Sequence, residues 1–582
     1  VRDRQNTYDI NSSLTVRSSD GKNAWQKEQI DLTSLAETDR KCVLFVGDAS
    51  GEMARAADRW CTYAKWDIAK CSSMEKFKEN DKNLPGMLVL ESEKYALDDN
   101  LKKIEELEQK GVIIVFGCLE DPKNIEKNQE LQDFMGIYKI VSQKTELTGA
   151  KLFEGLLLGG EVVYETPEDK DERDRQDLQL DVPWYQVGSG TKTYMVGLLD
   201  QSKQKETVEN EELPTLIWRN GIRNGSIFCV VGDYMKDSTA LGLLDGMVAE
   251  ASSYYIYPVV NAQNLSMINF PVFADENNEQ MMELYSQSIT GMARDIMWPS
   301  LISIVEKGGL KMTCFMHPQT DYEDGIEPTS KDLVFYLKQM KEQNAEAGLS
   351  LQYKNAGSLR DKLNQDAEFF RKADSSYKYG AAYTEEKDLD TVKALMNTEL
   401  MKNVSTLVCE YTEDEPVISY CTDSVTLQSV TSDGMNYTYS DDIRMRSIQS
   451  SLGYTNVMLN MQKIFWPERK KDRWQIMQKR FSSNLLTYWK KFTGFDSTTL
   501  SESNTRTRTF LNLDFSETRT DDEITLKTSE SGSWFILRTH GEEIEEIEGG
   551  TQKKLEDDVY LIQAQDTTVK IQVKTAGLHY SK

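Results

Sequence analysis

Apolar residues in the first part of the chain form short runs, and segments with helical periodicity separate these runs. The apolar runs are Cys42–Val46, Met87–Leu90 and Val112–Phe116, and the helical segments lie at 51–64 and 96–110. Short, almost wholly apolar runs are typical of strands that are buried on both faces. Such strands alternating with helices predict a parallel α/β sheet.

A second series of strands and helices begins near residue 250. The strand candidates are Tyr255–Val260, Leu310–Met316, Ala347–Leu351, Ser405–Cys409 and Asn456–Leu459, and helical patterns lie at 276–306, 330–345, 357–372, 387–401 and 470–493. Repeated strand-then-helix units over about 250 residues predict a (β/α) barrel, complete or partial.

Beyond residue 505 the pattern changes to alternating apolar and polar positions. Strand candidates begin at Phe510, Glu523, Ser533, Val559 and Val569. This alternation is typical of antiparallel sheets with one solvated face. We therefore expect an α/β multidomain protein with a polar segment at 1–40, a flavodoxin-like or Rossmann-like domain at 41–245, a barrel at 246–500 and a β-sandwich at 501–582.

The composition restricts the possible partners. The 582 residues carry 68 Lys and Arg against 95 Asp and Glu, a formal net charge of −27. Such a charge repels nucleic acid, so we exclude that class of partner. Solubility alone explains an acidic surplus, although the same surplus also suits a cationic partner.

The beginning of the chain bears on localisation. The sequence starts at Val1 rather than at a methionine, and no apolar stretch is long enough to span a bilayer. This start fits a chain trimmed after a signal peptide or membrane anchor. We therefore expect an extracellular or envelope protein, with membrane contact only through an anchor that this chain lacks.

The cysteines offer little catalytic chemistry. The eight cysteines are scattered without a C-x-x-C pair, which favours neither a zinc site nor a disulfide framework. Only Cys409 and Cys421 flank a hairpin, and the sequence leaves open whether they are bridged. Cys118, in Phe-Gly-Cys-Leu-Glu, resembles the position of a glutamine-amidotransferase nucleophile. Residues 1–316 contain no histidine to activate it.

Histidines are scarce, which limits metal chemistry. His317, His540 and His579 are the only three, and the last two fall in the predicted C-terminal sandwich. His317 follows the strand candidate that ends at Met316, so it should lie at the carboxyl edge of the barrel, where such folds place their sites. A metal site of His317 with Asp321 is one interpretation, and a packed histidine beside a polar loop is the other.

Five segments together resemble a known family. They are Leu213-Pro-Thr-Leu-Ile-Trp-Arg219, Tyr257-Pro-Val-Val-Asn261, Asn269-Phe-Pro271, Arg294-Asp-Ile-Met-Trp-Pro299 and Glu346-Ala-Gly348. In this order they resemble uncharacterised bacterial envelope proteins with a polysaccharide-deacetylase-like barrel, related to the deacetylase of Pel-type exopolysaccharide systems. The resemblance covers about 213–500.

The resemblance also implies where a deacetylase site would lie. Active relatives carry two aspartates before Phe-Pro, a general base and a metal ligand, where this chain has Ile268 and Asn269. They carry His-x-x-x-His after Glu-x-Gly-x, where this chain has Ser350 and Lys354. Hydrolysis by a metal-bound water requires ligands and a base. We therefore expect a degenerate site with no catalytic residue, metal or cofactor, and an ammonium of Lys354 where relatives hold the metal.

Aromatic residues near the predicted cleft suit sugar rings, since flat rings stack on the apolar faces of sugars. Each is equally compatible with a core position. Trp474 belongs to the same group of aromatics, and the candidate carbohydrate-binding residues are Trp298, His317, Asp321, Tyr353 and Trp466.

These observations lead to one hypothesis with two alternatives. The hypothesis is an exported pseudo-deacetylase that binds a polysaccharide, such as a cationic amino-sugar polymer, or envelope assembly proteins. The first alternative is an active metal-dependent deacetylase with a relocated site at His317 and Asp321. The second is a scaffold of an envelope assembly complex that contacts no glycan.

Overall fold

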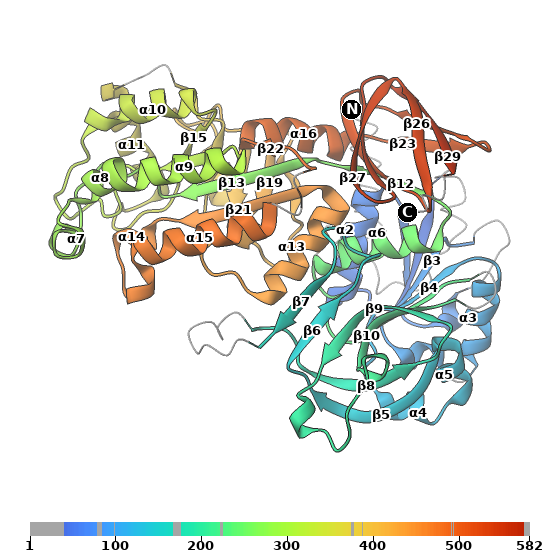
Figure 1. The fold of residues 1–582 in the computed structure, drawn as a ribbon. Coiled ribbons are helices and arrows are strands. Elements are labelled where there is room, and N and C mark those ends of the chain that lie inside the picture. The colour runs from blue at the N-terminus through green and yellow to red at the C-terminus, as the bar shows by residue number, and fades with distance from the viewer. Residues whose placement is uncertain are drawn as a thin grey trace, which may run out of the picture. The chain divides into compact units, whose positions relative to one another are not determined.

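The fold is known from a computed structural model, which divides the chain into two compact units (Figure 1). Unit 1 comprises 1–259, 438–452 and 512–582, and unit 2 comprises 260–437 and 453–511. The structure describes 40–575 except 78–83, 98, 167–175, 222–224, 374–376, 387, 490, 491 and 493. The polar segment expected at 1–40 therefore lies outside the described residues, apart from Arg40.

A nine-stranded sheet forms the first part of unit 1, in the order β2-β1-β3-β4-β11-β10-β9-β6-β7. The first five strands pair in parallel and the remaining pairs are antiparallel. The strands are β1 (Cys42–Val46), β2 (Asp67–Cys71), β3 (Met87–Leu90), β4 (Ile113–Phe116), β6 (Gly149–Leu152), β7 (Val162–Glu165), β9 (Thr191–Leu198), β10 (Thr215–Asn220) and β11 (Ile227–Val230). The parallel half agrees with the predicted strands near 42, 87 and 112.

Helices and a separate strand pair complete this part of unit 1. The helices are α2 (Glu52–Ala64), α3 (Asn100–Gln109), α4 (Pro122–Glu126), α5 (Gln129–Met135), α6 (Thr239–Ala251) and α13 (Tyr439–Leu452), and the pair is β5 (Ile137–Glu146) with β8 (Asp181–Val187). Helix α13 packs on α6, and Ser447 donates through its hydroxyl to the carbonyl of Thr239 over 2.5 Å. The segment 438–452 therefore belongs to unit 1, although both flanking segments belong to unit 2.

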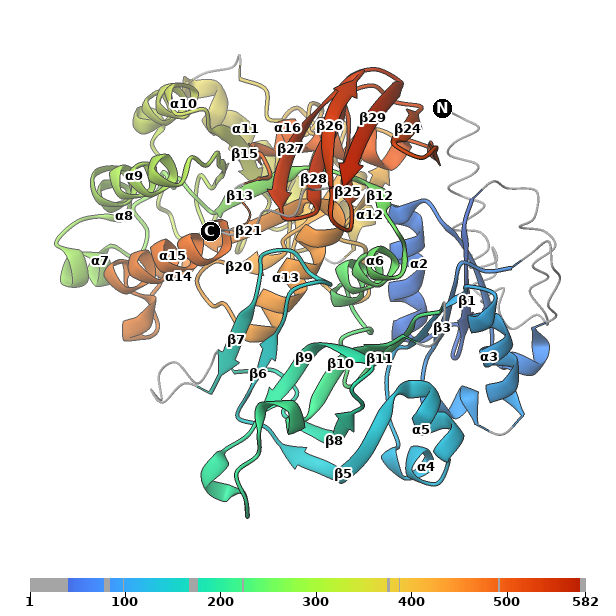
Figure 2. The ribbon, with the colours of Figure 1, turned by 45° about the vertical axis from the view of Figure 1, so that its right-hand side comes forward.

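Two four-stranded antiparallel sheets form the C-terminal part of unit 1 (Figure 2). Their orders are β12-β25-β28-β27 and β23-β24-β29-β26. The strands are β12 (Tyr255–Val259), β23 (Phe515–Arg519), β24 (Glu523–Thr528), β25 (Ser533–Arg538), β26 (Glu542–Glu548), β27 (Gly550–Glu556), β28 (Val559–Ala564) and β29 (Thr568–Thr575). Side chains of both sheets, among them Phe535, Ile562, Ile524 and Ile571, share one apolar cluster.

At the ends of the barrel region, the strand predicted at 255–260 is present but belongs to another sheet, and the strand predicted from Phe510 is absent. Tyr255–Val259 pairs with β25 in unit 1 instead of opening the sheet of unit 2. The segment that includes Phe510 is not a strand but the end of helix α16 (Leu500–Asn512), which buries Phe510 and Leu511 on one face. Unit 2 consequently begins at 260 and ends at 511, whereas the sequence analysis expected 246–500.

Unit 2 is built on a mainly parallel, ten-stranded sheet with the path β18-β19-β17-β16-β15-β14-β13-β21-β20 and with β22 paired to β13. The strands are β13 (Ala262–Ile268), β14 (Thr313–Met316), β15 (Glu346–Ser350), β16 (Ala381–Tyr383), β17 (Thr406–Cys409), β18 (Ile418–Thr422), β19 (Val425–Ser429), β20 (Ser432–Asp433), β21 (Tyr454–Asn460) and β22 (Ser497–Thr498). The sheet curls into a half-barrel, and among the described residues its edge strands β18 and β20 do not pair with each other.

Helices accompany the strands of this sheet, as Figure 1 shows for α9, α10, α11 and α15. They are α7 (Asn278–Tyr285), α8 (Ile289–Met292), a π-helical turn (Ala293–Met297), α9 (Trp298–Gly308), α10 (Leu333–Glu342), α11 (Leu359–Ala373), α12 (Leu389–Lys393), α14 (Gln462–Phe465), α15 (Trp474–Trp489) and α16. None of the helices in the described ranges is both long and apolar enough to cross a membrane.

Candidate functional site

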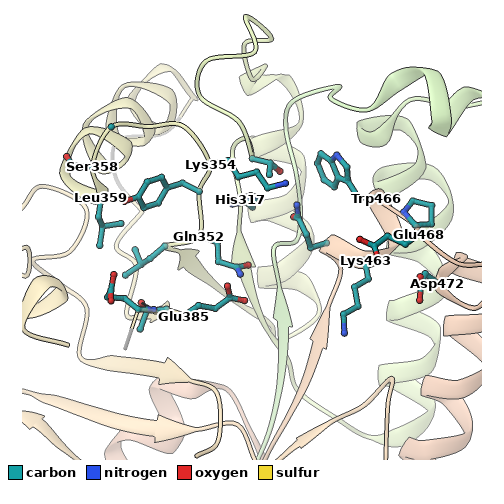
Figure 3. A pocket seen from close by; sticks show the side chains of 18 of the residues that line it. His317, Gln352, Lys354, Ser358, Leu359, Glu385, Lys463, Trp466, Glu468 and Asp472 are labelled. Atoms are coloured by element: carbon teal, nitrogen blue, oxygen red, sulfur yellow. Dashed lines mark hydrogen bonds between the residues drawn. The ribbon is translucent and has the colours of Figure 1, made fainter. Parts of the chain in front are cut away.

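The carboxyl edge of the unit 2 sheet carries a cleft of about 1220 Å³. Parallel strands place the residues that follow them along one edge, and binding sites form there in barrels of this kind. Here His317 follows β14, Gln352 follows β15, and Glu385 follows β16. Figure 3 shows the side chains along the cleft, with Leu359 and Glu385 on one side, Trp466 and Asp472 on the other, and His317 and Lys354 between them.

Asn269 and Ser350, two of the predicted degenerate positions, are in direct contact. The Ser350 hydroxyl donates to Oδ1 of Asn269 over 2.6 Å, and both side chains are fully buried. The Asn269 amide donates to the side-chain oxygens of Gln352 and of Asn460, the latter over 3.3 Å. Asn269 has a φ of 57°, a left-handed conformation that asparagine tolerates better than most residues. The four side chains form an uncharged hydrogen-bonded network, named here the neutral network.

The neutral network does not suit a divalent metal ion. Oδ1 of Asn269 already accepts a hydrogen bond, and its amide nitrogen is a donor that no cation can use. The neighbouring Ile268 is buried in an apolar cluster with Phe315 and Tyr383 and offers no ligand atom. In the part of the chain that the structure describes, no three His, Cys, Asp or Glu side chains gather into a metal-binding group.

Lys354 lies in the same cleft but outside the neutral network. Its backbone N–H donates to the carbonyl of Thr320 over 2.7 Å, and its own carbonyl accepts from the N–H of Tyr322. The side chain is exposed and lines the cleft. The ammonium is therefore free to meet a ligand in the cleft, whereas Asn269 and Ser350 lie behind the lining residues.

His317 lines the cleft as a buried, uncharged imidazole. Only 1% of its surface is exposed, and within the described structure its Nδ1 atom has no hydrogen-bond partner. Burial lowers the pKa of His317 well below its usual value, and the nearby Lys362 ammonium lowers it further. Lys362 is itself buried and paired with Asp366, which also accepts from the Tyr322 hydroxyl over 2.7 Å. His317 is therefore neutral at pH 7.

Asp321, the proposed metal partner of His317, is engaged elsewhere. Its carboxylate accepts from the side-chain amide of Asn355 over 2.9 Å and from the backbone N–H of Glu323 over 3.0 Å. Asp321 does not belong to the cleft lining. The geometry does not bring the Asp321 carboxylate and the His317 imidazole together as ligands of one ion.

The aromatic candidates separate into two groups. Tyr353, with 37% of its surface exposed, and Trp466 line the cleft. Trp298 is buried instead, stacked on Phe270 with ring centroids 6.2 Å apart, and Trp474 is buried as well. The expectation that Trp298 contributes to a cleft is therefore wrong, because its ring fills the core between α9 and the turn after β13.

Charged side chains that the sequence analysis missed also line the cleft. The acidic ones are Glu385, Glu386, Glu468 and Asp472, and the basic ones besides Lys354 are Lys463 and Arg469. Glu385 accepts from the Tyr383 hydroxyl over 3.3 Å. Two consecutive glutamates one residue after a short apolar run were the available signal, but β16 has only three residues and does not stand out as a strand.

The candidate features of unit 1 do not form a catalytic site. Cys118 is buried, and burial raises the pKa of its thiol to about 12. The turn at 47–51 between β1 and α2 is a place where backbone amides could hold an anion, but there the N–H of Asp48 donates to the Glu91 carboxylate over 2.7 Å, and the N–H of Ser50 donates to the Asp48 carboxylate. Carboxylates of the protein therefore already accept the hydrogen bonds of these two amides, which are not available to a bound anion.

The two cysteines near the predicted hairpin of unit 2 are separate thiols. Cys409 lies on β17 and Cys421 on β18, and both are free in the structure. Strand β19 pairs with both of these strands and lies between them, which keeps the two thiols apart.

Known proteins resemble this chain mainly in fold. The family described as "Uncharacterised protein conserved in bacteria (DUF2194)" matches residues 94–561. No curated protein sequence matches the chain. The crystal structure of Agd3, a carbohydrate deacetylase, is similar with a TM-score of 0.56 at 9% identity, covering 92% of this chain and 99% of that one.

Two further solved structures are similar only at a level that carries no argument. PurLQS from Thermotoga maritima has a TM-score of 0.24 at 8% identity, covering 37% of this chain and 100% of its own. An α-amylase from Anoxybacillus has a TM-score of 0.24 at 9% identity, covering 55% and 99%. Of these three structures, only that of Agd3 is similar enough to support a comparison. At 9% identity this similarity shows the fold alone.

Proposed function

The chain belongs to the uncharacterised bacterial family DUF2194, and we propose that its cleft binds a polysaccharide without deacetylating it. The observation that carries this proposal is the neutral network beside an open cleft. A metal-dependent deacetylase hydrolyses an amide with a metal-activated water and a base. Asn269 and Ser350 supply neither, and each is already hydrogen-bonded to the other. The cleft remains available for binding.

Sugar binding fits the lining of the cleft. Trp466 and Tyr353 offer rings for stacking, and the neutral His317 offers hydrogen bonds without charge. The exposed carboxylates of Glu385 and Glu386 suit the ammonium of a deacetylated amino sugar. The fold shared with a carbohydrate deacetylase is consistent with a ligand of this chemical class.

We place this binding in exopolysaccharide assembly at the cell envelope. In this proposal the protein is exported to the cell envelope and associates with other envelope assembly proteins. We further propose that its polymer is partly deacetylated and cationic, as a relation to Pel-type systems would imply. The formal charge of −27 supports association with such a polymer, since opposite charges speed the encounter.

The decisive experiment compares two series of oligosaccharides by calorimetry at low and high salt. Oligomers of glucosamine should bind, and 0.5 M NaCl should weaken their binding. Oligomers of N-acetylglucosamine should bind less tightly, because they lack the ammonium. Absence of binding by both series would remove the carbohydrate part of the proposal and leave the scaffold alternative.

The enzyme alternative is tested with the same protein. Acetate release from N-acetylglucosamine oligomers is measured after incubation with Zn²⁺, Co²⁺ or Ni²⁺, and the bound metal is counted. The expected results are no acetate above background and no bound metal in the cleft. Turnover that Asp321→Asn abolishes would establish a relocated site and overturn the proposal.

A further inference from the structure

The segment after β15 places two hydrogen-bond donors in a row on the wall of the unit 2 cleft. Gln352 and Lys354 both line the cleft, and residues two apart in an extended segment project to the same side. Figure 3 shows Gln352 nearer the strands, and Lys354 farther out with its ammonium end toward the side that carries Trp466. We name Gln352 and Lys354 the donor wall.

The neutral network fixes the orientation of the Gln352 amide. Its Oε1 atom accepts a hydrogen bond from the side-chain amide of Asn269, and its backbone N–H donates to Oγ of Ser350 over 3.3 Å. Because the oxygen is held on the buried side, the Nε2 group, which can only donate, remains for the cleft. The network that does not suit a metal ion therefore presents an uncharged donor at a defined place.

Backbone hydrogen bonds fix the base of the Lys354 side chain. Its N–H donates to the carbonyl of Thr320 over 2.7 Å, and its carbonyl accepts from the N–H of Tyr322 over 3.2 Å. Two buried carboxylates hold this neighbouring loop, since Glu276 accepts from the N–H of Thr320 over 3.0 Å and Asp366 accepts from the Tyr322 hydroxyl over 2.7 Å. A ligand therefore has to order only the stem of the lysine.

A buried polar atom in the same lining also indicates a ligand. His317 is only 1% exposed, and its Nδ1 atom has no hydrogen-bond partner among the described residues. Leaving such an atom without a partner is costly, so buried polar atoms of this kind are normally hydrogen-bonded. In the wall of a cleft, a hydroxyl of the ligand can supply the missing partner without bringing a charge.

Acidic side chains follow the neighbouring strand β16. Ser350 pairs with Tyr383, so the residues two positions further on, Gln352 and Glu385, lie at the same level of adjacent segments. One strand spacing and one two-residue step separate the backbone of Lys354 from that of Glu385, on the order of 8 Å. Both Glu385 and the next residue, Glu386, are exposed and line the cleft. A cationic place and an anionic place therefore lie next to each other along the cleft.

A fully deacetylated polymer does not match this distribution of charge. The ammonium of glucosamine is attracted by Glu385 and Glu386 but is repelled by Lys354. An N-acetylated sugar is uncharged, and its carbonyl oxygen accepts hydrogen bonds from an ammonium and from an amide. Repulsion between like charges is a common means of rejecting one of two similar ligands. The two forms of amino sugar are therefore favoured at different places in the cleft.

Given the proposed binding of a glycan in this cleft, we propose that the cleft recognises the acetylation pattern of the polymer. An N-acetylated residue lies at the donor wall, where its carbonyl oxygen accepts from Lys354 and Gln352, and the Trp466 ring supplies a stacking surface. A deacetylated residue lies beside Glu385 and Glu386. The ligand is thus a partly acetylated polymer, because neither a fully acetylated nor a fully deacetylated chain satisfies both places.

Calorimetry on the full chain with tetramers of defined acetylation tests this proposal. The probes are the glucosamine tetramer, the N-acetylglucosamine tetramer, and the mixed tetramers with one N-acetyl group at each position in turn. At least one mixed tetramer should bind about tenfold more tightly than either pure tetramer, since it gains a charge-assisted contact and avoids a repulsion. Equal or tighter binding of the glucosamine tetramer would overturn the proposal and leave glycan binding in place. Absence of binding by every tetramer would remove both.

Substitutions of Lys354 give a second readout. Lys354→Met should bring the glucosamine tetramer and the best mixed tetramer to similar affinity, and Lys354→Glu should make the glucosamine tetramer the tighter ligand. Glu385→Gln should weaken binding of the glucosamine tetramer and spare the N-acetylglucosamine tetramer.

Lys307→Met is the matched control for Lys354→Met. Lys307 lies exposed in the last turn of α9, away from the cleft lining, and the substitution removes the same charge. All affinities should remain unchanged in this variant. Equal changes in Lys354→Met and Lys307→Met would show that net charge alone governs binding and would overturn the proposal.

Discussion

Ser350 donates its hydroxyl hydrogen to Oδ1 of Asn269, and this 2.6 Å contact joins the end of β15 to the turn after β13 across the intervening β14. Because both groups are buried, neither can exchange its partner for water. The contact therefore stabilises the half-barrel where the end of β15 meets the turn after β13.

Ser350→Ala should destabilise unit 2 by about 1–3 kcal/mol, since it leaves Oδ1 of Asn269 buried without this donor. Urea unfolding followed by circular dichroism measures the loss. Ser303→Ala is the control, because Ser303 lies partly exposed on α9 without a side-chain hydrogen bond to the described residues. Equal stability of the two variants would show that the contact contributes nothing.

Asn269→Asp should also destabilise the protein, and more strongly at pH 8 than at pH 5. The substitution replaces the amide donor to Gln352 and Asn460 with a carboxylate oxygen in a buried site. A buried carboxylate without a cation costs several kcal/mol when ionised, so its pKa rises and protonation relieves the cost. Unfolding curves at both pH values measure the difference. A stabilising effect of Zn²⁺ on this variant would instead reveal a latent metal site.

Trp466→Ala and Tyr353→Ala should each weaken glycan binding, by about 2- to 10-fold per stacked ring. Both residues line the cleft, so their loss should leave the free energy of unfolding almost unchanged. Tyr138→Ala is the matched control, because Tyr138 is 76% exposed on β5 in the other unit. Titration with glucosamine oligomers compares the three variants. Equal affinity in all three would exclude this cleft as the binding site.

His317 should make the protein less stable in mild acid. Its pKa is well below the usual value in the folded state, whereas the unfolded chain takes up a proton near pH 6.5. The stabilising contribution is therefore present above pH 6.5 and is lost as the pH falls below it, by about 1.4 kcal/mol per pH unit. His317→Gln should show a smaller loss between pH 6.5 and 5. If the free energy of unfolding falls equally with pH in the unmodified protein and in His317→Gln, His317 is not the group responsible.

Cys118 should react slowly with iodoacetamide at pH 8. A pKa of about 12 leaves about a thousandth of the thiolate found in an ordinary cysteine. Peptide mapping of alkylated native protein measures the rate, and the same peptide in urea is the control. Rapid alkylation of Cys118 in the native protein would instead show that its thiol is reactive enough to act as a nucleophile.

The apolar pattern of the sequence predicted strand β15, but it did not indicate strand β13. The run Ala347–Leu351 is apolar, and the strand lies at Glu346–Ser350. In contrast, β13 contains the polar residues Gln263, Asn264 and Ser266, which are buried in the structure. Their hydrogen bonds to other segments of unit 2, such as Ser266 to Asn456 over 2.7 Å, allow this burial. Tertiary partners of this kind leave no trace in local periodicity.

Other errors arose from patterns that fit two structures. The apolar run at Tyr255–Val259 is compatible with either sheet, and only its pairing with β25 decides. The segment 511–515, which runs from the end of α16 to the start of β23, alternates apolar and polar residues as a strand would. For the site, the resemblance predicted positions that meet in space, Asn269 and Ser350, but could not show that Lys354 faces outward from them. Side-chain direction depends on neighbours far apart in the chain.

The position of α13 has a consequence for synthesis on the ribosome. Unit 1 needs 438–452 and 512–582, so its first 259 residues emerge long before their last partners. Until β25 has been synthesised, the edge of β12 has no strand with which to pair. An unpaired strand edge favours aggregation or binding by a chaperone. Maturation of this protein should therefore be largely post-translational, and stop codons placed between residues 260 and 511 should yield fragments that are less soluble than the full chain.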